Sequence, residues 1–175
     1  MKRQICAALG ALLAAGIALA IAVPAGAETS GNETFKGVIE VSGVSGTRTV
    51  ISSVVVAKGV FSGTGSVVEI PNLPTDPDNV SRDFLVFADG SIQIISTLVD
   101  FSVSQNGQSC HFGATLQQTV EIVGGTGRFA GASGSFTATG GGPALLARNP
   151  DGSCAFAQNP LHETDMFAMN GTLSF

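Results

Sequence analysis

The chain has 175 residues, among them 23 glycines and 11 phenylalanines, and it contains neither tryptophan nor tyrosine. Thirteen acidic residues outnumber eight basic ones, and no basic run occurs anywhere. Nucleic acid is therefore excluded as a partner, because neutralising phosphates requires clustered Lys and Arg. The composition likewise excludes a coiled coil, a polytopic membrane protein and a disordered tail.

The first 27 residues have the layout of a secretory signal peptide. Lys2 and Arg3 precede an uncharged apolar run over residues 5–23, and Pro24 is followed by the small-x-small sequence Ala25-Gly26-Ala27. Left uncut, this run would be long enough to span a bilayer, but the Ala-Gly-Ala site favours cleavage. We therefore expect a protein secreted or held in the cell envelope, cut after Ala27 and without a stable membrane span.

Cleavage after Ala27 leaves residues 28–175, which carry six basic and thirteen acidic side chains and a formal charge of −7. A chain of this length can bury most of its apolar surface in one core, so we expect a single domain. Its patterned segments are short and rich in β-branched residues, and none repeats apolar residues at helical spacing. In chain order, the expected strands are 34–41, 49–57, 60–70, 83–87, 91–103, 110–117, 119–123, 132–139 and 165–173.

Between these segments lie turn signals, of which Asp89-Gly90 and Asn106-Gly107 are the strongest hairpin markers. Eight or nine closely spaced strands predict an all-β fold, either a closed antiparallel barrel or a sandwich. Two proline-containing connections, 71–82 and 140–163, are long enough to be functional or to need anchoring. Because an exported protein favours disulfides, we expect Cys110 and Cys154 to be bonded and to anchor the second connection, the alternative being two free thiols.

Residues 124–130, after the expected strand 119–123, match the G-x-G-x-x-A pattern of dinucleotide-binding proteins. That site needs a helix beginning at the last glycine, whereas residues 131–140 alternate small and polar side chains as a strand does. We therefore interpret the stretch as a tight glycine turn between two strands, and no cofactor is expected.

The same stretch, with Gly124, Gly125, Gly127, Arg128 and Phe129 followed by Ala-Gly-Ala-Ser-Gly, resembles the G-G-T-G-[RK]-F-x-x-A-x-G signature of the allene oxide cyclase and dirigent superfamily. Bacterial members include small exported proteins of unknown function. The resemblance implies a closed, calycin-like barrel of eight antiparallel strands with an apolar small molecule inside. It also implies that any catalytic carboxylate lies inside the barrel near its mouth.

Strand alternation gives two candidate carboxylates for such a role. Glu69 shares a strand face with Phe61 and Val67, and Asp100 shares one with the apolar residues Ile92, Ile94 and Leu98. A carboxylate on an apolar face is a candidate acid or base. The alternative is that both lie where their strands emerge into water. No metal is expected, because His111 and His162 have no third ligand at a suitable spacing.

Three functions follow as hypotheses. The first is binding of a small apolar ligand by inward Phe, Ile and Val side chains. The second is a cyclase or isomerase of the allene oxide cyclase type, in which Glu69 or Asp100 polarises the substrate. The third is a structural or interaction module of the cell envelope whose interior is filled. Assembly into oligomers through the outer face is open.

Overall fold

The computed structural model describes residues 29–44 and 46–175, so the expected signal peptide at 1–27 lies outside the described residues. The described chain is all-β, and its only helical element is one 3-10 turn, η1 (Gly127–Phe129). The strands are β1 (Ser30–Ser42), β2 (Thr49–Gly59), β3 (Ser62–Ile70), β4 (Val80–Phe87), β5 (Gly90–Asn106), β6 (His111–Gly125), β7 (Ser133–Gly141), β8 (Pro143–Leu145) and β9 (His162–Ser174).

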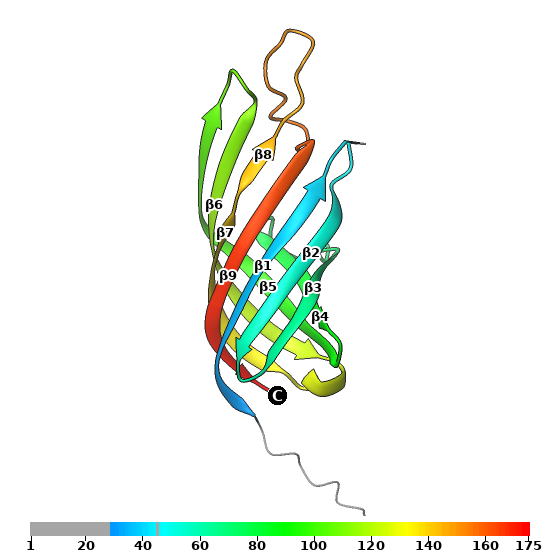
Figure 1. Ribbon diagram of the computed structural model, residues 1–175, viewed down its shortest axis with the longest axis vertical. Coiled ribbons are helices and arrows are strands. Elements are labelled where there is room, and N and C mark those ends of the chain that lie inside the picture. Colours follow the sequence, from blue (N-terminus) through cyan, green and yellow to red (C-terminus); the bar gives the residue numbers. More distant parts are fainter. Residues whose placement is uncertain (1–28, 45) are drawn as a thin grey trace, which may run out of the picture.

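All nine strands belong to one antiparallel sheet, in the order β1-β2-β3-β4-β5-β6-β7-β9-β8. A further pairing between β1 and β9, continuous from Ser30 opposite Ser174 to Ser42 opposite His162, closes eight of them into a ring. The short β8 lies between β9 and β6 beyond the end of β7 (Figure 1). This confirms the expected antiparallel all-β fold.

Several expected boundaries were wrong. The connection expected over 71–82 ends before Val80, where β4 begins. The segments expected as 110–117 and 119–123 form the single strand β6, because Gln118 continues the ladder and lies opposite both Leu98 and Ala138. The connection expected over 140–163 contains β8, which leaves 146–161 as its irregular part.

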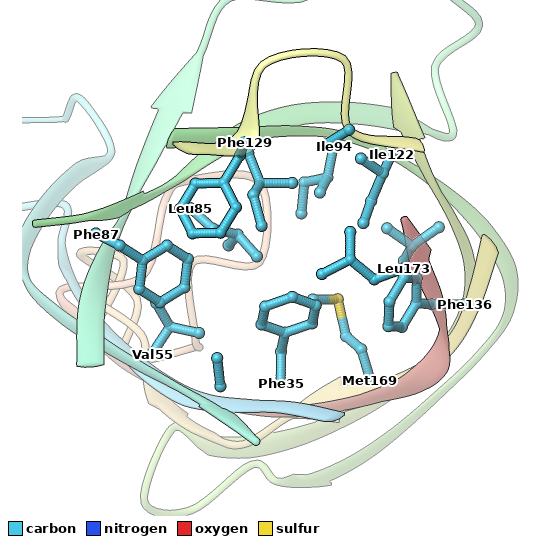
Figure 2. Close-up of a cluster of buried hydrophobic side chains, with 14 of the residues drawn as sticks. Phe35, Val55, Leu85, Phe87, Ile94, Ile122, Phe129, Phe136, Met169 and Leu173 are labelled. Carbon is cyan, nitrogen blue, oxygen red and sulfur yellow. The ribbon is translucent and has the colours of Figure 1, made fainter. Parts of the chain in front are cut away.

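The interior of the ring is filled at one end by aromatic side chains. Figure 2 shows Phe35, Phe87, Phe129 and Phe136 pointing inward from different parts of the chain. Phe61 joins them, with ring centroids 4.8 Å from Phe129 and 5.0 Å from Phe87. Burial of these rings is the main apolar contribution to stability at this end, which η1 closes (Figure 1).

The glycine-rich stretch is the turn that holds Phe129 in this position. Gly127 has φ +59°, and a Cβ there would lie 2.2 Å from the carbonyl oxygen of Asp89. A residue with a side chain is therefore excluded from this close approach between two turns. Arg128 lies over the rings of Phe61 and Phe175, with its Cζ 5.8 and 5.6 Å from their centroids. The turn leads into β7, as expected, and offers no helix for a pyrophosphate.

At the opposite end, the Cys110–Cys154 disulfide is present, as predicted. Both cysteines are buried and pack with Leu146 and Phe112 in a small second core. The bond anchors the 146–161 connection to the beginning of β6, where both project beyond the ring (Figure 1). A disulfide is compatible with an extracellular protein. Within residues 29–44 and 46–175, no helix has the length and apolar character needed to cross a membrane.

Candidate functional site

The ring interior contains a pocket of about 470 Å³ between the aromatic end and the disulfide end. Its floor is apolar and is formed by inward side chains of six strands. These are Val67, Leu85, Ile94, Leu116, Ala138, Phe167 and Met169. The pocket exists because the inward residues of β7 are small at this level, namely Ala138 and Gly140. The next inward residue of β7 toward the aromatic end, Phe136, fills the interior.

The rim of the pocket is charged. Glu69 on β3 and Asp83 on β4 lie directly opposite each other in the ladder, so both carboxylates belong to the inner face. Asp165 on β9 lines the pocket from another side, and Glu163 precedes it by two positions on the same face. Arg48, in the connection before β2, brings the one guanidinium that contacts this group within the described chain.

Arg48 pairs with three of the four carboxylates. Its Nη1 donates a hydrogen bond to Glu69, its Nε lies 3.8 Å from Glu163, and its Nη2 lies 3.7 Å from Asp165. No ion pair within the described chain involves Asp83, because the neighbouring Arg82 is held by Asp76, with Nε 2.6 Å from Oδ2. With four carboxylates and one guanidinium, the rim has a formal net charge of −3.

The environment shifts the pKa values of these groups. Burial raises the pKa of Asp83 to about 6, with a further rise from the charge of Glu69 and an opposing effect of Arg48. Burial also raises the pKa values of Glu163 and Asp165, and nearby carboxylates add to both shifts. Burial lowers the pKa of Arg48, but its hydrogen bond to Glu69 and the surrounding negative charges outweigh burial and raise it overall. With a pKa of about 6, the Asp83 carboxyl is able to gain and lose a proton near that pH.

One buried hydroxyl lies in the pocket wall. Ser96 on β5 is 5% exposed, and it lies opposite Val120 and Ser81 on the inner face. Asp83 lies opposite Ile94, which makes Asp83 and Ser96 diagonal neighbours. Among the residues that the structure describes, no hydrogen bond involves the Ser96 hydroxyl, and no fully enclosed polar side-chain atom lacks a partner. The hydroxyl therefore faces the open volume of the pocket.

Glu69, one of the two predicted carboxylates, lies at this rim, while Asp100 lies outside the pocket. The alternation used for Asp100 was wrong because β5 contains a bulge at Val99. Leu98 lies opposite Gln118, a pocket residue, but Asp100 lies opposite the next residue, Gln117, on the outer face. The Asp100 carboxylate is exposed and accepts a hydrogen bond from the Phe101 backbone N–H.

Sequence reasoning missed Asp83, Asp165 and Arg48. Asp165 alternates with Phe167 and Met169, and that pattern was sufficient to find it. Asp83 begins a stretch in which both faces carry large apolar residues, so alternation does not identify the inner one. Arg48 lies in an unpatterned connection, and only the closed ring brings it to the carboxylates.

The two histidines lie on either side of β8, since His111 and His162 are both opposite Leu145. Within the described parts of the chain, no three His, Cys, Asp or Glu side chains are arranged to hold a metal ion.

Comparisons of the chain with protein-family models, with curated proteins and with solved structures gave no match. The fold and the site alone define the class to which the protein belongs. It is an all-β protein whose ring of eight antiparallel strands encloses a pocket with an apolar floor and an acidic rim.

Proposed function

We propose that this protein binds a small, largely apolar molecule inside its ring of strands. The observation that carries the proposal is the pocket of about 470 Å³, lined at its floor by residues such as Leu85, Ile94 and Met169. Ligand pockets typically measure about 300–1,000 Å³ and combine an apolar lining with a few polar groups.

The resemblance of residues 124–134 to the allene oxide cyclase and dirigent signature supports the same proposal. In this reading the ring is a calycin-like barrel, and the signature turn stabilises its closed end through Phe129. A barrel of eight strands has an interior that side chains fill or that holds one small ligand. Ala138 and Gly140 favour the second alternative over a purely structural module, because larger residues would fill the space they leave.

Filling the pocket tests the proposal. We expect the neutral dye N-phenyl-1-naphthylamine to bind in a 1:1 ratio with a rise in fluorescence, and Ala138→Leu to weaken binding at least tenfold. Thr139→Leu is the matched control, because Thr139 is exposed on the outer face of the same strand. Equal affinity in the wild type and Ala138→Leu, with both proteins folded by circular dichroism, would contradict the proposal.

Asp83 favours a second candidate, an isomerase or cyclase that shapes a reactive substrate. A carboxyl with a pKa of about 6 beside an apolar floor suits a general acid or base. For an enzyme, Asp83→Asn abolishes turnover and leaves dye binding intact. For a binding protein, no reaction is found with any bound compound.

We propose further that the protein is exported and carries its ligand outside the cytoplasm. Native mass spectrometry of protein purified from the medium of its own organism tests this. The expected polypeptide begins at Glu28, contains the disulfide, and loses a reproducible additional mass on denaturation. A polypeptide that retains residues 1–27 would contradict export with cleavage.

A further inference from the structure

We propose that the pocket selects ligands that carry a protonated amine, held between the Asp83 carboxylate and the Ser96 hydroxyl with the apolar part of the ligand on the pocket floor. This inference rests on the binding function proposed above and adds the chemical class of the ligand.

One carboxylate at the rim remains without a cationic partner in the described part of the chain. Arg48 contacts Glu69, Glu163 and Asp165, whereas Asp83 has no cationic partner within the described chain. Removing a carboxylate from water costs free energy unless the carboxylate is paired with a cation. A cationic group in the pocket is therefore stabilised most when it lies beside Asp83. The raised pKa of Asp83, caused first by burial, is a second sign of the same unpaired position.

Ser96 places a hydroxyl beside Asp83 in the pocket wall. The residue is buried and lines the pocket, and its hydroxyl, which forms no hydrogen bond within the described chain, is open to the pocket volume. A hydroxyl open to the pocket is able to accept a hydrogen bond from a bound ligand. Ser96 and Asp83 are diagonal neighbours on the inner face, so one ammonium group can lie between them. Its N–H groups can then donate to both side chains.

The charges of the rim disfavour an anionic ligand. An anionic ligand would require a free cation at the rim, and the guanidinium of Arg48 already donates to Glu69 and lies within 4 Å of two further carboxylates. Any anion would also face the unpaired charge of Asp83. Like charges at short distance in a partly buried site repel strongly, so the pocket discriminates by charge as well as by shape.

Three probes with the same ten-carbon chain test the inference: decylamine, decanol and decanoate, at pH 7.5 and below their micelle concentrations. Each is titrated by calorimetry and by displacement of N-phenyl-1-naphthylamine. We expect decylammonium to bind at least tenfold more tightly than decanol, and decanoate to bind least. Asp83→Asn and Ser96→Ala should each reduce the preference for decylammonium over decanol at least threefold.

Asp100→Asn is the matched control, because it removes the same charge from the outer face and should leave the preference unchanged. Decanol or decanoate binding as tightly as decylammonium would overturn the inference while the proposed function stands. An undiminished preference in Asp83→Asn would overturn it as well. If none of the three probes binds and the dye does not bind either, the proposed function itself fails.

Discussion

At the scale of single residues, Asp83 connects the pocket to the stability of the fold. Its pKa is about 6 in the folded protein against an ordinary value of 3.8, with burial as the main cause. Between these two values the folded state holds more protons than the unfolded chain. The free energy of unfolding therefore decreases as the pH rises from about 4 to about 6.

Asp83→Asn should remove this decrease in the free energy of unfolding with rising pH. The difference between the two pKa values corresponds to at most about 3 kcal/mol at neutral pH. We expect the variant to be more stable than the wild type at pH 7.5 by about 1–3 kcal/mol and nearly equal to it at pH 4, measured by urea unfolding. Glu163 and Asp165 have pKa values raised by burial, so a slope of the same sign should remain. A variant less stable than the wild type at pH 7.5 would contradict this assignment, and Asp100→Asn controls for net charge.

At the scale of elements, different interactions stabilise the disulfide end and the aromatic end of the ring. The 146–161 connection has backbone hydrogen bonds of its own, and it is joined to the start of β6 by Cys110–Cys154 and by the small core with Leu146 and Phe112. The aromatic end depends on η1, which holds Phe129 at 1% exposure among the rings of its neighbours. The pocket lies between these two ends and contains neither cysteine.

Replacing both cysteines by serine should therefore destabilise the fold without closing the pocket. A disulfide that encloses a loop of this length contributes about 2–4 kcal/mol, mainly by restricting the unfolded chain. We expect a loss of that size in urea unfolding, faster proteolysis within 146–161, and dye affinity within about twofold of the wild type at a temperature where the variant is folded. A large loss of dye affinity in the folded variant would show that the connection forms part of the site.

At the scale of the whole molecule, the ring depends on close approach of the strands at the seam where it closes. Gly37 on β1 lies between β2 and β9, and a Cβ there would lie 2.4 Å from the Val54 carbonyl oxygen and 2.5 Å from Phe167 Cζ. The Phe167 ring thus covers a position where no side chain fits. This contact allows Phe167 to line the pocket beside the seam.

Gly37→Ala should strain the seam and lower the free energy of unfolding by about 1–3 kcal/mol, as overpacking in cores does. Gly31→Ala is the control on the same strand, because a Cβ there would meet only Val60 Cγ2 at an ordinary distance of 3.4 Å. Thermal unfolding of the two variants measures the difference. Equal melting temperatures would contradict the role given to Gly37.

The amino-acid sequence by itself determined the class of fold, because alternation and turn residues act over a few neighbouring positions. The Asp89-Gly90 and Asn106-Gly107 turns lie at strand ends as expected, and the pairing of Cys110 with Cys154 followed from there being two cysteines in residues 28–175. Glu69 was found because its strand alternates regularly up to the rim.

Only the tertiary structure decided the composition of the site. The bulge at Val99 reverses the face of Asp100, and a bulge depends on how two strands pair rather than on one strand's alternation. Asp83, Asp165 and Arg48 belong to segments far apart in the chain, and they meet because the β1–β9 seam closes the ring. The charge of the rim arises from this closure, which brings side chains of β4, β9 and the connection before β2 to one pocket.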